Sequence, residues 1–345
     1  MTIFDLITSN ELQAYWEEAV KGLPPYLGES LFDEAKKLGL DIKWIKGAKG
    51  LPVVLKPSAF DAAAIPRKRI GFDKISAQMP YFKESMYIDE ELRQQLNMAL
   101  ETGNDAYITS IIENVFDDEM NLLKGARAQR ERMRMMALTT GVISITANGQ
   151  DYDYDYGLPG THKAEASVSW SNAAADIIED IRTGIDKIYG DTGVKPTRAV
   201  CTGKTFGYMR KNDIIKKSLL QLTNGTGYIT DEQIKNYIFD ILGIEIAVDD
   251  QMYVDESGTP QKFVQDDTFT LFPSGNVGTF TFGTTPEESD LLSGTSANVS
   301  VVDTGVAICT SKKIDPVNVD TKVSMICLPS LPVADQIYII DVING

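Results

Sequence analysis

The stretch NDAYITSIIENVFDDEMNLLKGARAQRERMRMMALTT, residues 104–140, sets the organisation of the whole chain. Its apolar residues recur at three- and four-residue steps, which is the period of one face of an α-helix. They are Ile108, Ile111, Ile112, Val115, Leu122, Leu123, Ala126, Met133 and Ala137. Gly125 is a weak point that a helix tolerates. We therefore predict a single long helix from Asn104 to Thr140.

The charges of this stretch are sorted by sign. The first half is acidic, with Glu113, Asp117, Asp118 and Glu119, and the second half is basic, with Lys124, Arg127, Arg130, Arg132 and Arg134. This is the sign order that a helix dipole favours. We interpret the basic half as a subunit contact or a solvated face in preference to a DNA site, with Arg127, Arg130 and Arg134 as candidate contact residues.

The residues before this helix divide into an arm and a projection. Residues 1–40 hold two short helical candidates, Asn10–Val20 and Ser30–Leu40, separated by the helix breaker Gly-Leu-Pro-Pro at 22–25. Residues 41–90 are rich in large apolar residues without a helical period, and prolines at 52, 57, 66 and 80 interrupt them. We expect an extended hairpin or projecting loop whose apolar surface another subunit must cover.

Candidate contact residues in this projection are of two kinds. The apolar candidates are Trp44, Val53, Phe60 and Phe72. The basic candidates form the cluster Arg67-Lys68-Arg69, which fits either an ion-pair contact with an acidic neighbour or a solubilising loop tip.

The residues after the long helix predict a hairpin, then an α/β unit, then extended structure. The hairpin begins at Val142, turns through Asn148–His162 and returns through Ala166–Trp170. The α/β unit has helices Ala173–Tyr189, Thr205–Leu220 and Thr230–Leu242, with strands Arg198–Cys201, Ile244–Val248 and Thr268–Phe272. The last strands, expected to rejoin the long-helix unit, are Val299–Thr310, Lys322–Leu328 and Gln336–Val342.

Composition limits the class of protein. A chain of 345 residues, 43% of them hydrophobic, exceeds the size at which one core usually divides, so we expect two packed units. Neither a signal peptide at MTIFDLITSNELQ nor a membrane-spanning stretch is recognisable, so we expect neither secretion nor membrane insertion. A net charge of -16 disfavours a sequence-specific nucleic-acid binder and is compatible with a DNA container. The spacing of Cys201, Cys309 and Cys327 suits reduced, buried thiols in a cytoplasm.

Three motifs are tested as chemical sites and set aside. His162, the one histidine, lies in a turn-rich stretch and is interpreted as a solvent-exposed loop residue in preference to a member of a Ser-His-Asp or Cys-His site. Gly203-Lys204-Thr205 follows a strand, but Arg198 stands where a P-loop needs its first glycine, so we favour a strand-to-helix turn.

The third motif is DYDYDYG, residues 151–157, in which Asp151, Asp153 and Asp155 match the first ligand positions of a calcium loop. Tyr156 and His162 replace the glycine and glutamate that such a loop needs. We interpret the motif as an acidic hairpin tip, with a weak cation site as the alternative. We expect no enzyme activity, no cofactor and no metal site.

Two stretches carry a family resemblance. IPRKRIGFDKISAQMPYFKESMYIDEELRQQL (65–96), followed by the long helix and RMRMMALTTGVISI (132–145), resembles the major capsid proteins of lambda-type tailed bacteriophages, the capsid protein E family. The ending VNVDTKVSMICLPSLPVADQIYIIDV (317–342) is similar to the closing strands of that family.

The resemblance implies a mixed α+β fold of the Hong Kong 97 type. Its expected parts are an N-terminal arm (1–40), an extended loop (41–90), a peripheral domain with a spine helix (91–172 and 311–345) and an axial domain (173–310). The implied function is a major capsid protein that assembles through pentamers and hexamers into an icosahedral shell around double-stranded DNA, without sequence-specific contacts.

The resemblance also implies partners and a place of assembly. The partners are scaffolding protein, portal, terminase and decoration protein, and assembly into the virion takes place in the cytoplasm of the bacterial host. Alternatives are an encapsulin-like cargo shell, a tail or baseplate protein, and an enzyme that binds a phosphorylated ligand at Gly203-Lys204-Thr205.

Overall fold

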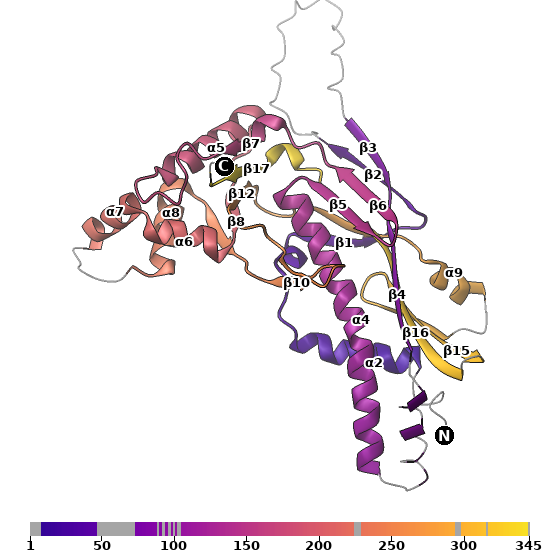
Figure 1. Ribbon diagram of the computed structural model, residues 1–345. Coiled ribbons are helices and arrows are strands. Elements are labelled where there is room, and N and C mark those ends of the chain that lie inside the picture. Colours follow the sequence, from indigo (N-terminus) through magenta and orange to yellow (C-terminus); the bar gives the residue numbers. More distant parts are fainter. Residues whose placement is uncertain are drawn as a thin grey trace, which may run out of the picture. The chain divides into compact units, whose positions relative to one another are not determined.

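The computed structural model describes residues 8–46, 73–87, 90–91, 94–95, 98, 101, 105–223, 229–293, 298–314 and 317–343 (Figure 1). Contacts divide the chain into two compact units, each assembled from separate stretches of sequence. Unit 1 comprises residues 1–42, 77–134 and 279–330, and unit 2 comprises residues 43–76, 135–278 and 331–345. Helices and strands occur in both units, so the predicted mixed α+β class is confirmed.

The long helix is present as predicted. Helix α4 runs over Asp105–Thr139, and all but its last turn belongs to unit 1. Its periodic apolar residues Val115, Leu123 and Met133 are buried, which is why this stretch is helical along its whole length.

The other helices of unit 1 are α2 (Ser9–Ala19), η1 (Val20–Gly22), η2 (Leu27–Ser30) and α9 (Pro286–Ser293). Thr8 caps α2 in a capping box with Glu11. The apolar face of α2 buries Leu12 and Trp16, and the indole nitrogen of Trp16 donates to Asp303 at 3.3 Å. The first predicted helix, Asn10–Val20, is therefore confirmed.

Unit 1 has a six-stranded sheet built around one long strand. β16 (Val317–Ser330) pairs antiparallel with β15 (Val306–Ile314), β4 (Tyr81–Tyr87) and β13 (Gly278–Phe282). β14 (Asn298–Val302) extends the sheet beyond β15, and β1 (Phe32–Lys36) adds to β13. One core strand thus joins residues that lie more than 200 positions apart in sequence.

Unit 2 has a five-stranded sheet covered by helices, the expected α/β arrangement. Its strands, in spatial order, are β7 (Lys163–Glu165), β17 (Tyr338–Asp341), β12 (Thr268–Phe272), β8 (Arg198–Cys201) and β9 (Glu245–Val248). Its helices are α5 (Ile177–Thr192), α6 (Gly203–Lys211), α7 (Asp213–Thr223) and α8 (Asp231–Leu242), with the short turns η3 (Gly160–His162) and η4 (Ala334–Gln336). Apolar residues of α5, α6, α8 and the sheet form one buried cluster that includes Trp170 and Phe269.

Three two-stranded sheets complete the described residues. β2 (Asp41–Lys46) pairs with β3 (Asp73–Gln78), β5 (Val142–Ala147) with β6 (Gln150–Asp155), and β10 (Met252–Val254) with β11 (Pro260–Lys262). Asn148 and Gly149, with φ of 51° and 72°, form the two-residue turn between β5 and β6.

Four predictions about local structure are wrong. Ser30–Leu40 contains strand β1 instead of a helix, because the backbone of β1 pairs with β13. Just after β1, Lys37 N donates to the carbonyl of Phe282, the last residue of β13, at 2.8 Å. Thr205–Leu220 is two helices, because Asn212 is extended and its side chain bonds Ala175 O and Ile215 N.

The other two errors concern strands. Val299–Thr310 is the hairpin of β14 and β15, with Asp303 in the left-handed region at φ 50°. The strand returning from β5 is the acidic β6 itself, while β7 pairs parallel with β17. In the Asp-Tyr repeat, aspartates and tyrosines alternate as residues do on the two faces of a strand. Pairing with β5 makes this stretch a strand, although its composition resembles that of a turn.

The two units overlap the expected parts unevenly. Unit 2 contains 173–278 of the expected axial domain, but 279–310 joins the sheet of unit 1, because β13, β14 and β15 bond to β16 or to each other. β17, expected beside the long helix, lies in the sheet of unit 2. The four-part division of the chain stays a prediction.

Candidate functional site

The predicted contact residues of the projection lie mostly outside the described residues. Val53, Phe60, Arg67, Lys68, Arg69 and Phe72 belong to that set. Trp44 is described, and its side chain is 9% exposed. Its ring centre lies 5.6 Å from that of Tyr156, within the same unit, so Trp44 already has a cover in its own chain.

Arg127 has partners inside unit 1 instead of a free surface. Its Nε and Nη2 donate to the two carboxylate oxygens of Glu29 at 2.8 and 2.9 Å, and Nη2 also donates to the carbonyl of Pro24 at 3.0 Å. Its guanidinium carbon lies 4.6 Å from the ring centre of Tyr26. Burial alone would raise the pKa of Glu29, but the hydrogen bonds and charge of Arg127 lower it overall.

Arg130 and Arg134 continue the same network. Arg130 pairs with Asp303 at 2.7 Å, and Arg134 pairs with Glu34 at 2.6 Å and with Glu131 at 3.6 Å. The exposed fraction of both arginine side chains is 5% or less. We call Arg127, Arg130 and Arg134 with their carboxylates Glu29, Glu34, Glu131 and Asp303 the arginine clamp. Burial and pairing inside unit 1 exclude the solvated face for these arginines, and the predicted subunit contact stays a prediction.

A glycine allows the closest approach within the arginine clamp. Gly28 N donates to Glu131 Oε1 at 2.7 Å, and a Cβ atom at Gly28 would lie 2.6 Å from the other carboxylate oxygen. The clamp thus fixes the segment from Pro24 to Glu34 and the β14–β15 turn onto α4. Sequence reasoning missed its acidic half, because Glu29 and Glu34 lie about 100 residues before their partners and no local pattern marks them.

A second buried carboxylate lies at the start of α9 in unit 1. Glu287 accepts from Lys322 Nζ at 2.6 Å, Ser324 Oγ at 2.8 Å and Tyr81 OH at 3.0 Å. Burial would raise the pKa of Glu287, but Lys322 and these hydrogen bonds outweigh it and hold the pKa at about 2. The adjacent Glu288 pairs with Lys36, the last residue of β1. Both carboxylates therefore connect α9 to strands of unit 1.

His162 is buried, which corrects its interpretation as an exposed loop residue. Its Nδ1 lies 3.0 Å from the carbonyl oxygen of Ile337 and its Nε2 lies 2.9 Å from Asp191. Neither partner is a nucleophile, so the side chain joins η3 to α5 and η4 instead of serving a triad. The hydrogen bonds from His162 and Lys187 lower the pKa of Asp191.

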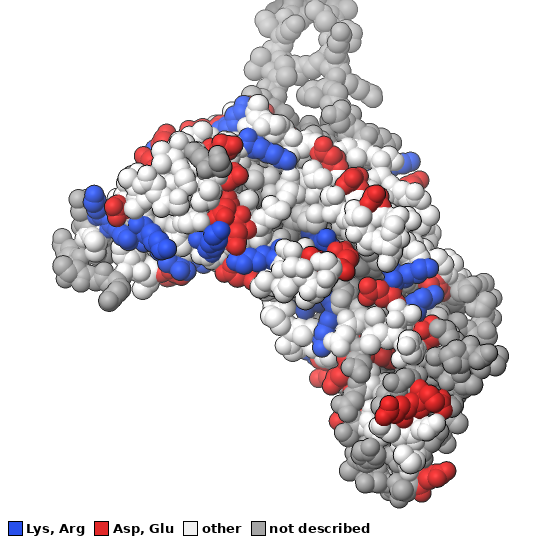
Figure 2. All heavy atoms as spheres, viewed as in Figure 1, with Lys and Arg blue, Asp and Glu red and all other residues white. Residues whose placement is uncertain are grey.

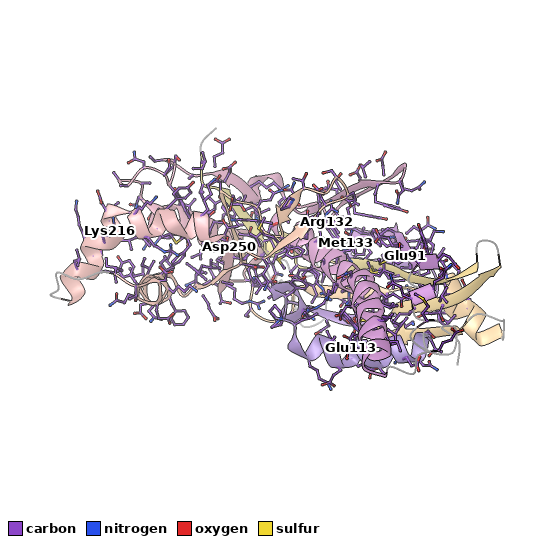
Figure 3. All side chains as sticks on the ribbon, turned by 60° about the horizontal axis from the view of Figure 1, so that its bottom comes forward. Glu91, Glu113, Arg132, Met133, Lys216 and Asp250 are labelled. Carbon is purple, nitrogen blue, oxygen red and sulfur yellow. The ribbon has the colours of Figure 1, made fainter. Side chains whose placement is uncertain are left out.

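The Gly203-Lys204-Thr205 turn is capped from within the protein. Thr202 Oγ1 accepts from Thr205 N, and Gly203 N lies 3.1 Å from both carboxylate oxygens of Asp250, the residue labelled in Figure 3. A carboxylate of the chain therefore takes the place at this helix start where a phosphate would bind. Lys204 pairs with Asp267 at 2.6 Å, so the predicted strand-to-helix turn is confirmed.

The three aspartates of β6 share one exposed face of a strand, so they are not a hairpin tip. Among the described residues, no cluster of three or more metal-ligating side chains could hold an ion. Cys201, Cys309 and Cys327 are buried thiols, as predicted, and burial raises the pKa of Cys201 and Cys327 to about 12. None of the described helices is long and apolar enough to cross a bilayer.

Comparison with known proteins gives one family and a set of similar folds. The model of the family "Phage major capsid protein E" matches residues 8–342. A protein described as a prophage capsid protein from Escherichia coli has 16% identity and a TM-score of 0.61, with 97% of this chain and 99% of that chain covered. No curated protein matches the chain.

Two further solved structures share the fold. A phage-related protein from Bordetella bronchiseptica has 12% identity and a TM-score of 0.57, with 97% of each chain covered. A capsid chain of cyanophage A-1(L) has 11% identity and a TM-score of 0.51, covering 93% of this chain and 94% of that one. The fold is therefore that of Hong Kong 97-type capsid proteins, as predicted.

Proposed function

The chain belongs to the phage major capsid protein E family, and from that premise we propose how this head-shell subunit assembles. Identical subunits close into pentamers and hexamers through heterologous contacts, and these rings join into an icosahedral shell that encloses double-stranded DNA. Many modest contacts add by multivalency, so no single residue carries the function. The observation that carries this proposal is the family match over residues 8–342.

The family separates the chain from the alternatives. The family and the fold are those of structural capsid proteins, so the chain is not an enzyme. The family model that matches residues 8–342 is that of a phage capsid protein, so the chain is a capsid component of the virion.

Rigid subunits support assembly by many weak contacts. The arginine clamp orders the N-terminal segment on α4 inside one chain, so little conformational entropy remains to be lost when neighbouring subunits meet. The clamp would thereby favour assembly by ordering the subunit beforehand.

The extended loop is proposed to lap onto a neighbouring subunit through Val53, Phe60, Phe72 and the cluster Arg67-Lys68-Arg69. β2 ends at Lys46, β3 begins at Asp73 and the two strands pair, so the two ends of the intervening segment 47–72 are held together by one small sheet. Such a segment can be removed without breaking the main sheet of either unit. Proposed partners are a scaffolding protein, a portal, a terminase and a decoration protein, and the proposed site of assembly is the bacterial cytoplasm.

Deleting residues 50–72, which lie between β2 and β3, tests the loop contact. We expect soluble capsomers that do not form shells in negative-stain electron microscopy, whether or not a scaffolding protein is co-expressed. A second variant replaces the same residues by a Gly/Ser linker of equal length, which keeps the length of the chain and removes the apolar side chains of the loop. Normal shells from either variant would contradict the loop contact.

A further inference from the structure

A local excess of basic residues lies on α6 and α7 of unit 2. Residues 204–217 contain five basic residues and one acidic residue, in a chain whose net charge is -16. Figure 2 shows Lys and Arg atoms gathered over the two helices. The basic residues are Lys204, Arg210, Lys211, Lys216 and Lys217.

Two of these cations are neutralised within unit 2. Lys204 pairs with Asp267, and Arg210 makes a two-point contact with Asp231 at 2.6 and 2.8 Å. Lys211 and Lys217 are exposed and have no acidic partner among the described side chains. Their charge is therefore available to a partner.

An exposed apolar residue lies between these two lysines in the sequence. Ile214 and Lys217 lie three residues apart on α7, whereas Lys211 is the last residue of α6, just before the extended Asn212. Ile214 is 38% exposed. Figure 3 shows Lys216 on the same helix, where its Nζ donates to the carbonyl of Lys211. We call Lys211, Ile214 and Lys217 the α7 face.

The outer side of α8 has the opposite charge. Glu232, Phe239 and Asp240 lie seven and eight residues apart, which places them on one side of an α-helix. Glu232 and Asp240 are exposed, with no basic partner among the described side chains, and Phe239 is 55% exposed. We call these three residues the α8 face. Each face thus combines an exposed apolar residue with two exposed charges of one sign, and the exposed Asp213 lies one helical turn before Lys217 on α7.

This composition fits a protein partner better than a nucleic acid. Phosphate contacts use cations and polar donors, whereas a protein contact combines an apolar centre with a charged rim. The exposed Ile214 and Phe239 provide such a centre, and opposite charges at the rim fix register and select the partner.

We propose that the α7 face of one subunit docks on the α8 face of a second copy of this chain, its neighbour in the ring. This inference rests on the proposed assembly into rings. A ring forms by heterologous contacts, in which two different surfaces of the same chain meet at every interface. The two faces are such a pair, because they differ in sequence and are complementary in charge.

Charge reversal and exchange test the docking. The variants are K211E/K217E, E232K/D240K and all four changes together, with R182E/K195E as the control that reverses two other exposed cations of unit 2. The measurements are sedimentation velocity and negative-stain microscopy of the protein, expressed with and without a scaffolding protein. Far-UV circular dichroism monitors folding of each variant.

We expect each two-residue reversal on the faces to raise the protein concentration needed for half assembly by about tenfold or more, since like charges then oppose each other. For the four-residue variant, the protein concentration needed for half assembly should lie within about twofold of that of the unaltered protein, because the opposite charges face each other again. The control should assemble like the unaltered protein.

The remaining outcomes separate this inference from the proposed function. If the unaltered protein forms neither rings nor shells, the assembly proposal itself fails. If it assembles but K211E/K217E assembles equally well, or the four-residue variant is not rescued, the docking of α7 on α8 is overturned. If K211E/K217E forms shells but loses retention of double-stranded DNA, the basic face is a nucleic-acid contact instead.

Discussion

The basic half of α4 and the basic surface of α6 and α7 look alike in sequence and differ in the structure. Both concentrate lysine and arginine within about four helical turns. In α4, the side chains of Arg127, Arg130 and Arg134 are 8%, 5% and 1% exposed and are paired with carboxylates of the same unit. On α7, Lys211 and Lys217 are exposed.

The residue types follow this difference. Arginine suits the interior because its planar fork makes two or more directed hydrogen bonds and is weakly hydrated, whereas the lysine ammonium is compact and strongly hydrated. Removing a buried arginine leaves its carboxylate partner as an uncompensated charge in a medium of low dielectric constant. The arginine clamp should therefore determine the stability of the subunit, and the α7 face should determine how the subunit contacts its neighbours.

Removing one arginine of the clamp should have the largest effect on stability. R134M removes the cation that pairs with Glu34 and with Glu131, and the exposed fraction of the Glu131 side chain is 0%. We expect a loss of about 3–5 kcal/mol in the free energy of unfolding. Urea denaturation of the monomeric subunit measures it, with K217M as the matched exposed control. A loss below about 1 kcal/mol would contradict the internal role of the clamp.

Replacing the buried carboxylate Glu287 should have an intermediate effect that depends on pH. The pKa of Glu287 is about 2 in the folded chain, below its ordinary value of 4.5, so the ionised form stabilises the fold above about pH 4.5. That stability, about 3 kcal/mol, is lost as the pH falls from about 4.5 to about 2.

E287Q should therefore be less stable than the unaltered protein at pH 7, and the difference should shrink on acidification. Unfolding free energies measured in urea from pH 7 to pH 3 check this. A difference that stays constant over that range would show that Glu287 does not act through its charge.

Neutralising the two lysines of the α7 face should have the smallest effect on the stability of the isolated subunit. K211Q/K217Q should change the unfolding free energy by less than about 0.5 kcal/mol, because exposed charges without partners contribute little to folding. The same variant should make assembly less sensitive to salt between about 0.1 and 1 M, because screening acts on the charges it removes. A large loss of stability would mean that these lysines are structural.

Local sequence patterns predicted several elements and failed where tertiary contacts decided. The periods of α4 and of Thr230–Leu242 are those of helices with one buried face, and both helices form. Thr8 and Thr230 mark helix starts through capping boxes, which are local signals. Ser30–Leu40 has no such cap, and its backbone hydrogen bonds are made by a strand about 245 residues further along the chain.

The sequence by itself determined the long helix, the order of elements that resembles a phage capsid protein, and the absence of a recognisable catalytic motif. These depend on local period, turn residues and motif spacing. Only the tertiary structure decided which charges are internal: Arg134 and Lys217 are both helical cations, but Glu34 reaches Arg134 from a distant strand, and Lys217 meets no acidic side chain in the described residues. The burial of a charge depends on what packs against it, and its partners come from parts of the chain that no local pattern connects.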